Sequence, residues 1–208
     1  LMLLGIVPAD GDPESFARFQ SWLAEERHGG MSYLENHHEI RRDPARLLEG
    51  AQSIIVCALP YREAERGPVL KPRVAQYARL RDYHKVLRQK LEAMALRLQE
   101  SNDFVFRAVT DSAPLLERSV AAKVEHGFIG KNTCFIHPRE GSLFLLGEML
   151  VNCVLPYDQR DPTPLLNRDP ERGGCGSCRR CQVHCPTGAL DRDYQIDARR
   201  CLSYWTIE

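Results

Sequence analysis

Five cysteines gather near the carboxyl end of the chain, and their spacing suits an iron–sulfur cluster. They are Cys175, Cys178, Cys181, Cys185 and Cys201, and a proline follows the fourth. The run C-x₂-C-x₂-C-x₃-C-P is the spacing of bacterial ferredoxin clusters, in which the fourth cysteine ligates a second cluster. Structural disulfides are usually spread along small secreted chains, so this crowding predicts metal binding by reduced thiols in a cytoplasmic protein.

The number of thiolates limits how many clusters can be completed. A pair of [4Fe–4S] clusters needs two sets of four cysteines, and only the five named above are suitably placed. Either a second cysteine motif follows Glu208 or a single cluster forms. Both ends of the chain interrupt structured sequence, so we expect a piece of a longer protein. Zinc is the alternative metal, although structural zinc usually binds two separated cysteine pairs or mixes Cys with His.

Asp111 is the best candidate for acid–base chemistry. It follows residues 104–109, which predict a short strand, and it precedes Ser112-Ala113-Pro114, which predicts a helix ending near Gly127. Ligands commonly bind where the strands of α/β sheets end, so a carboxyl group there could donate a proton. An aspartate in this setting is also a common helix cap, and the residues alone favour that interpretation. A helix amino terminus would favour the carboxylate, whereas burial would favour the neutral acid.

The elements that must position these groups follow from the hydrophobic pattern. Helix signals begin at Asp12-Pro13-Glu14 and last until Gly29-Gly30, and an amphipathic helix is predicted from Asp82 to about Gln99. Apolar runs predict strands over residues 53–59, 133–137 and 143–155. Residues 1–156 therefore predict one α+β (α/β-like) domain. A Pro-, Asp- and Gly-rich stretch at 157–174 marks a boundary, so residues 157–208 form a second, cysteine-rich module.

The overall composition gives little attraction to nucleic acid. Lys plus Arg and Asp plus Glu both number 28, so the formal net charge is zero. Local arginine pairs at 41–42, 179–180 and 199–200 could contact phosphates, but solvated surface positions are the simpler interpretation. No apolar run approaches the length that crosses a bilayer, and no secretory leader is recognisable. We expect a cytoplasmic protein without a membrane partner.

Several blocks of sequence, in the same order, resemble the epoxyqueuosine reductase family, the cobalamin-dependent iron–sulfur enzymes of queuosine synthesis in tRNA. The resemblance extends over nearly the whole chain, and no single block would decide it. Besides the cysteine run, the matching blocks are residues 28–34, 81–88, 110–118, 127–133, 141–148 and 197–208.

This resemblance implies a fold, a reaction and partners. The fold would be a B12-binding domain related to nitroreductases, followed by a ferredoxin-type module that holds two [4Fe–4S] clusters in the full-length protein. The reaction would be the two-electron removal of the epoxide oxygen from epoxyqueuosine at the wobble position of tRNA. The partners would be that tRNA and an unidentified external electron donor, and we expect a monomer. Members of the family continue past the point where this chain ends, with a second cysteine motif.

The resemblance also implies roles for individual residues. Cys175, Cys178 and Cys181 would ligate the cluster distal to cobalamin, whereas Cys185 and Cys201 would belong to the second cluster. Asp111 would protonate the departing oxygen and lie beside the cobalt, which shifts the balance from helix cap to catalytic acid. The other expected cobalamin contacts are Ser112, Tyr83, His84, Lys131, Asn132, Gly147 and Glu148.

Some of these weaker candidates also have a simpler explanation. Tyr83 and His84 open a helix, where polar residues usually lie on the surface. Lys131 and Asn132 follow a Gly-x-x-Gly turn, where they could meet cobalamin amides or an RNA phosphate, or Lys131 could be an ordinary exposed lysine. Gly147 could allow close approach of the corrin. Glu148 lies in an apolar strand, where a buried carboxyl would need a partner.

Three other functions compete with this one. A related corrinoid reductase, similar to reductive dehalogenases, would share both cofactors. A ferredoxin-like electron carrier would use residues 1–156 only to dock a partner and would bind no cobalamin. A zinc-stabilised nucleic-acid module would be colourless and contain stoichiometric zinc.

Overall fold

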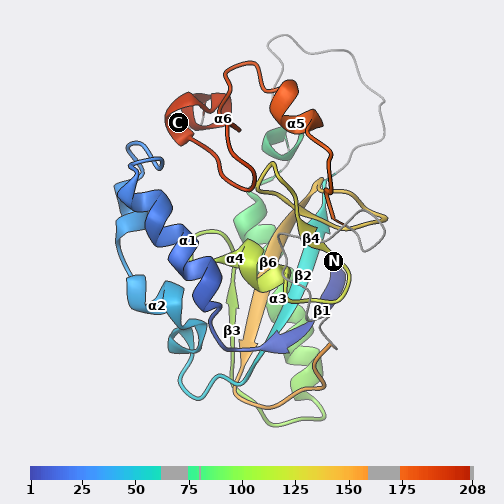
Figure 1. Ribbon diagram of the computed structural model, residues 1–208. Coiled ribbons are helices and arrows are strands. Elements are labelled where there is room, and N and C mark those ends of the chain that lie inside the picture. Colours follow the sequence, from blue (N-terminus) through green and yellow to red (C-terminus); the bar gives the residue numbers. More distant parts are fainter. Residues whose placement is uncertain (62–74, 80, 159–173, 207–208) are drawn as a thin grey trace.

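A central antiparallel sheet organises the molecule. The computed structural model describes residues 1–61, 75–79, 81–158 and 174–206. The sheet has the order β1-β2-β6-β3, and each neighbouring pair is antiparallel (Figure 1). Its strands are β1 (Met2–Pro8), β2 (Ser53–Pro60), β6 (Phe144–Val151) and β3 (Phe106–Val109). The strands expected at 53–59 and 104–109 are therefore confirmed, while the last one ends before residue 155.

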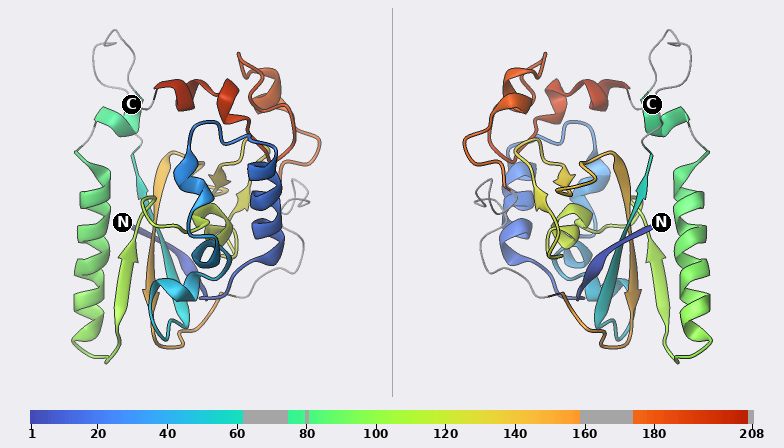
Figure 2. Two further views of the ribbon diagram at one scale, coloured as in Figure 1. Left: turned by 90° about the vertical axis from the view of Figure 1, so that its left-hand side faces the viewer. Right: turned by 90° about the vertical axis from the view of Figure 1, so that its right-hand side faces the viewer.

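Helix α3 (Tyr83–Gln99) covers one face of the sheet, as Figure 2 shows. Its inward side chains Leu87, Leu91 and Ala95 are fully buried, and they share a core with Ile55 and Met149 of the strands. Asp82 caps the helix by accepting a hydrogen bond from the backbone N–H of His84. The predicted amphipathic helix is thus confirmed, with its capping residue just outside it.

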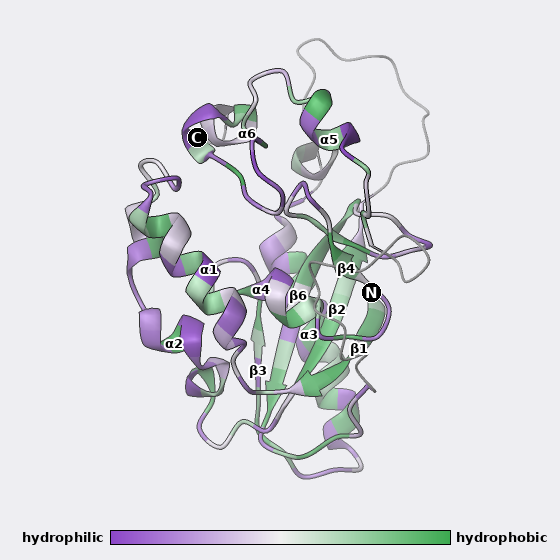
Figure 3. Ribbon diagram, viewed as in Figure 1, coloured by the Kyte–Doolittle hydropathy of each residue, from purple (hydrophilic) through white to green (hydrophobic). Residues whose placement is uncertain are grey.

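The opposite face of the sheet is covered by short helices and a small hairpin. Ile54, Val56 and Leu150 of the sheet point to this side and pack with Val120 and Phe135 in a second core. The strands are mostly apolar, as a sheet covered on both faces requires, whereas the surrounding helices mix apolar and polar residues (Figure 3). The covering elements are α1 (Pro13–Ala24), α2 (His38–Arg42), α4 (Glu117–Ala121), β4 (Phe128–Ile129) and β5 (Phe135–Ile136). This three-layer arrangement is an α+β fold.

Two predicted helices are shorter than expected. Asp12 caps α1 as predicted, through the backbone N–H groups of Glu14 and Ser15, but this helix ends at Ala24 rather than at Gly29-Gly30. The chain turns there because Glu26 adopts a positive φ of 55° and Arg27 leaves the helix to pair with Asp191. The helix expected from Asp111 to Gly127 contains only α4.

The cysteine-rich residues 174–206 form a mostly irregular segment above the sheet (Figure 1). They include α5 (Arg180–Val183) and α6 (Leu202–Thr206). Short 3₁₀ helices occur here and elsewhere, at Ser32–Glu35, Pro44–Leu47, Gln76–Arg79 and Ala198–Arg200. Most of the predicted boundary, residues 159–173, lies outside the described residues. Among the helices that the structure describes, none has the length and apolar character needed to cross a membrane.

Candidate active site

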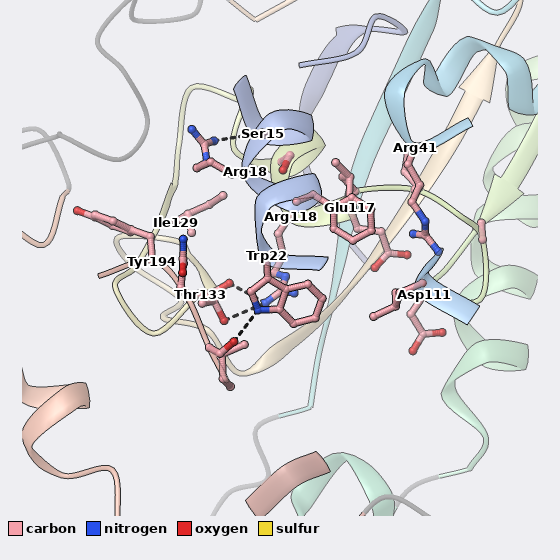
Figure 4. Close-up of a pocket in the computed structure, with 18 of the residues that line it drawn as sticks. Ser15, Arg18, Trp22, Arg41, Asp111, Glu117, Arg118, Ile129, Thr133 and Tyr194 are labelled. Carbon is pink, nitrogen blue, oxygen red and sulfur yellow. Dashed lines mark hydrogen bonds between the residues drawn. The ribbon is translucent and has the colours of Figure 1, made fainter. Parts of the chain in front are cut away.

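A pocket of about 470 Å³ opens between α1, the segment that follows β3, and the cysteine-rich segment. This volume is typical of small-molecule sites. Figure 4 shows Trp22 at its centre, with Arg41, Glu117 and Asp111 on one side and Tyr194 on the other. Beyond the residues that Figure 4 labels, the lining includes Phe19, Tyr33, Leu34, Ser112, Ala113, Leu115, Leu116, Ser119, Gln195 and Ile196.

Asp111 lies at the edge of this pocket and is held by the first turn of α3. The Tyr83 hydroxyl donates a hydrogen bond to Oδ2 of Asp111, and Nε2 of His84 lies 2.7 Å from Oδ1. The other ring nitrogen of His84 is 3.0 Å from Oδ1 of Asp82. The Tyr83 and His84 rings stack with centroids 4.0 Å apart. Three residues singled out from the sequence are thus brought together, and Asp111 has two hydrogen-bonding neighbours.

The expectation that Asp111 caps a helix is wrong. Helix α4 begins at Glu117, its cap position is Leu116, and no side chain caps it. Residues 110–115 form turns instead, in which the N–H of Ala113 donates to the carbonyl of Thr110 over 2.9 Å. The Asp111 side chain is 44% exposed and lies at no helix terminus.

Two glutamates behind Asp111 have strongly raised pKa values. Burial, reinforced by the negative charge of Asp111, raises the pKa of Glu117 to about 8, against the opposing effect of Arg118. Glu148 is completely buried in β6, and burial together with the charges of Glu117 and Asp111 raises its pKa well above the usual range. Burial and the hydrogen bond to Asp111 likewise raise the pKa of Tyr83. The site therefore favours protonated side chains.

Arginines supply positive charge to the same pocket, although the sequence contains only weak signals of this role. Arg41 is buried rather than solvated, lies 5.5 Å from the centroid of the Phe19 ring, and donates from Nε to the carbonyl of Asn36. Arg118 donates to the backbone and hydroxyl oxygens of Thr133 over 2.8 and 3.1 Å. Arg41 belongs to one of the arginine pairs noted in the sequence, but the pair alone does not reveal burial in a pocket.

The cysteines that the motif predicts as ligands are free thiols. The backbone N–H of Lys131 donates to Sγ of Cys175 over 3.3 Å. Burial would raise the pKa of Cys185, but hydrogen bonds from backbone N–H groups around Leu190 and Thr187 outweigh it and lower the pKa to about 7. Among the described residues, no three His, Cys, Asp or Glu side chains converge as ligands of a single metal ion.

The remaining predicted contacts differ in how far they are available to a ligand. Ser112 is exposed and lines the pocket. Asn132 accepts from the backbone N–H of Cys134, which fixes the turn. Lys131 is buried and forms a 3.0 Å ion pair with Asp193, so it joins the hairpin region to the cysteine-rich segment.

Gly147 and Glu148 both lie beneath other elements. A Cβ at Gly147 would lie 2.8 Å from Cδ2 of Leu87 and 3.1 Å from Cδ1 of Leu91, so this glycine admits helix α3. That packing gives it a different role from the corrin approach expected from the sequence. Glu148 has no hydrogen-bond partner for either carboxyl oxygen within the described part of the chain.

Known proteins resemble this chain over nearly its whole length. Residues 41–112 match the family described as epoxyqueuosine reductase QueG, DUF1730, and residues 174–208 match a 4Fe-4S double cluster binding domain. Over nearly its whole length, the chain is similar to the epoxyqueuosine reductase family. It is 39% identical over 202 residues to the epoxyqueuosine reductase of Escherichia coli, and the aligned region covers 94% of this chain and 51% of the relative. The enzyme of Pseudomonas aeruginosa is 40% identical, with 94% and 54% covered.

Solved structures of the family agree with this fold. The epoxyqueuosine reductase of Streptococcus thermophilus superposes with a TM-score of 0.82 at 30% identity, covering 96% of this chain and 52% of that one. A crystal structure of an epoxyqueuosine reductase with an epoxyqueuosine-modified tRNA-Tyr stem loop superposes with a TM-score of 0.74, at the same identity and coverage. This chain therefore spans about half the length of the relatives it matches.

Proposed function

We propose that the chain is an oxidoreductase that reduces epoxyqueuosine to queuosine in tRNA. Its longer relatives are named epoxyqueuosine reductases. The observation that carries this proposal is the position of Asp111. It lies at the edge of a pocket, held by Tyr83 and His84, and the opposite wall belongs to the cysteine-rich segment through Tyr194. An acid, a ligand-sized pocket and the cysteine-rich segment, which we propose carries electrons, therefore lie next to one another. The tRNA-bound relative supports the choice of substrate.

Asp111 would act as the general acid of the reaction. Epoxide deoxygenation breaks two C–O bonds, forms a C=C bond, and consumes two electrons and two protons as the oxygen leaves as water. The departing oxygen needs a proton because an alkoxide is a poor leaving group. Tyr83 and His84 would orient the carboxyl group, and a ligand that covers its exposed surface would exclude water and favour its neutral form. A Bacillus subtilis relative, described as having its catalytic aspartate loop swung out of the active site, supports an acid on a loop that moves.

The cysteines fit an iron–sulfur ligand set. Soft thiolates suit iron–sulfur clusters, and backbone N–H groups directed at Cys175 and Cys185 would stabilise sulfur ligands there. Cys175, Cys178 and Cys181 would hold one [4Fe–4S] cluster, and Cys185 and Cys201 a second, with cysteines of the longer protein completing both. The clusters would supply electrons singly from an external donor. The proposed division is a catalytic domain over residues 1–156 and a ferredoxin-type module over 157–208.

Cobalamin is the proposed second cofactor, in a B12-binding domain related to nitroreductases. The polar side chains at the first turn of α3 and the Asp111 loop fit its amides. Asp111, Ser112, Tyr83 and His84 are the proposed contacts, because they are at least partly exposed beside the pocket. When bound, cobalamin would supply a strongly reducing cobalt centre next to the substrate.

The pocket arginines would hold the nucleotide. Arg18, Arg41 and Arg118 all line the pocket, and arginine is well suited to phosphate and ribose oxygens. These local charges could bind RNA although the chain as a whole is neutral. We further propose that the protein acts in the cytoplasm as a monomer.

Substitution of the acid tests this function. Asp111→Asn, in the full-length protein loaded anaerobically with iron, sulfide and cobalamin, should abolish conversion of epoxyqueuosine-containing tRNA while cobalamin stays bound. Mass spectrometry of the digested nucleosides measures conversion, and the corrin absorption spectrum measures binding. Asp103→Asn, at an exposed position beyond the end of α3, is the matched control. Full activity of Asp111→Asn would rule out the acid role, and wild-type protein that converts no epoxyqueuosine would rule out the function.

A further inference from the structure

Glu148 is a buried acid that the proposed reaction leaves without a role. It lies in the middle of β6, opposite Val56 of β2 and Val109 of β3. Its side chain is 0% exposed, and neither carboxyl oxygen has a hydrogen-bond partner among the described residues. A carboxylate without a partner is very unfavourable in such surroundings, so Glu148 holds a proton.

Glu117 brings a second such acid to the surface of the pocket. It is the first residue of α4, which packs on β6, and it lines the pocket beside Asp111. Its Oε1 atom is buried and has no partner in the described part of the chain. The pKa of Glu117, raised to about 8 by burial and by Asp111, keeps it largely protonated at neutral pH. Burial and then the charge of Glu117 raise the pKa of Glu148, so we treat the two carboxyl groups as one interacting pair.

Strand pairing connects the backbone of Glu148 to the segment that carries Asp111. Val109 pairs with Glu148 across β3 and β6, and only Thr110 separates Val109 from Asp111. The Thr110 hydroxyl is also buried, with 1% of the residue exposed, and has no described partner. A hydroxyl both donates and accepts hydrogen bonds. Because these buried groups make no hydrogen bonds to one another among the described residues, proton transfer between them requires intervening water.

The stoichiometry of the reaction creates a need for such a group. The oxygen leaves as water only after it has received two protons, and Asp111 can carry just one at a time. We propose that Glu117 and Glu148 are a proton store that reloads Asp111 within a single turnover. This inference rests on the proposed function and extends it. After Asp111 has given its proton to the epoxide oxygen, Glu117 protonates the Asp111 carboxylate, and Glu148 returns a proton to Glu117. Solvent refills the pair when the product leaves.

The groups around the pair are consistent with this direction of transfer. Tyr83 and His84 of α3 hold Asp111, and Arg118 of α4 opposes the rise in the pKa of Glu117. On β2, burial and then the charge of Glu148 raise the pKa of Cys57 to about 12, so that thiol stays protonated. Arg41 lies on the same side of the pocket as Glu117 and Asp111 (Figure 4).

Infrared spectroscopy tests the store directly. Full-length wild-type protein should show protonated carboxyl bands at neutral pH that shift in D₂O. Glu148→Gln and Glu117→Gln should each remove part of this signal. Glu125→Gln, with a side chain 57% exposed, is the matched control and should leave it unchanged. If Glu148→Gln does not fold, Glu117→Gln at the pocket surface gives the same test. Identical spectra for wild type and both variants would overturn the store.

The pH dependence of turnover tests the reloading role. The wild-type kcat should fall as the pH rises through about 8, because Glu117 then loses its proton. Glu117→Gln should lower kcat by about tenfold, less than the roughly 10²- to 10⁴-fold contributed by an acid that acts on the substrate itself, and should remove this alkaline limb with little change in KM. Wild-type kinetics in this variant would overturn the reloading. Inactive wild-type protein would overturn the proposed function together with it, whereas missing infrared bands in an active enzyme would overturn the store alone.

Discussion

At the scale of single residues, the site depends on how one exposed carboxyl group is held. Asp111 lies on turns rather than at a helix terminus, so its geometry depends on its neighbours. The Tyr83 hydroxyl and the His84 ring contact different oxygens of the same carboxyl group. His84 is in turn fixed by Asp82, the residue that caps α3. The cap of one helix thereby orients the acid of another segment.

The hydroxyl of Tyr83 provides a test of this arrangement. Tyr83→Phe keeps the ring that stacks on His84 but removes the hydrogen bond to Asp111. We expect kcat to fall by about ten- to a hundredfold while KM changes little, because the acid itself, worth roughly 10²- to 10⁴-fold, is still present but less well positioned. Steady-state kinetics across pH would measure both constants.

A matched substitution controls for the loss of a hydroxyl group. Tyr157→Phe removes a phenol whose O–H donates to the carbonyl of Gln52, away from Asp111. Its kcat and pH profile should match those of the wild type. A Tyr83→Phe protein with the wild-type profile would show that His84 alone is sufficient to position the acid.

At the scale of elements, helix α3 fixes the site because it packs closely on β6. Gly147 is the position that allows this contact, since any side chain there would meet Leu87 and Leu91. The first turn of α3 then places Tyr83 and His84 at the end of β3, where the Asp111 loop begins. Gly147 therefore affects the position of Tyr83 and His84 indirectly, because it allows α3 to pack closely on β6.

Gly147→Ala should destabilise the protein by about 1–3 kcal/mol, the usual cost of overpacking a close-packed core. Leu96→Ala, on the exposed side of the same helix, should change stability by less than about 0.5 kcal/mol. Denaturant unfolding monitored by circular dichroism would measure both. Wild-type stability in Gly147→Ala would mean that the two leucines move aside easily and that packing does not require the glycine.

The sequence predicts these elements unequally well, for physical reasons. Helix α3 and strand β2 have strong periodic or continuous apolar patterns, and both are confirmed. The helix after Asp111 was overestimated because Pro114 and the polar residues around it resemble a helix start, although residues 110–115 form turns. The buried state of Arg41 and the acidic pair of Glu117 and Glu148 depend on tertiary packing between distant segments. No local pattern in the sequence encodes that packing.

At the scale of the whole molecule, the segment after α1 joins the sheet domain to the cysteine-rich residues. Arg27 is 3% exposed and pairs with Asp191, while its carbonyl accepts from the N–H of Ala198 over 2.8 Å. The Trp22 indole N–H donates to the carbonyl of Ile196 over 2.6 Å. These contacts place Tyr194 and its neighbours against the pocket, so the proposed electron path depends on this attachment.

Asp191→Asn should loosen this attachment. The substitution leaves the buried Arg27 guanidinium without its main counter-charge, which costs about 3–5 kcal/mol in a fully buried pair. The cost here should be smaller, because the Asp191 side chain is 36% exposed. We expect faster hydrogen exchange at the Ala198 amide and earlier proteolytic cleavage within residues 174–206, with the sheet unaffected. Exchange mass spectrometry on anaerobically loaded protein, with Asp103→Asn as the control, would measure both. Unchanged protection at Ala198 would show that the Trp22 and Lys131 contacts hold the segment by themselves.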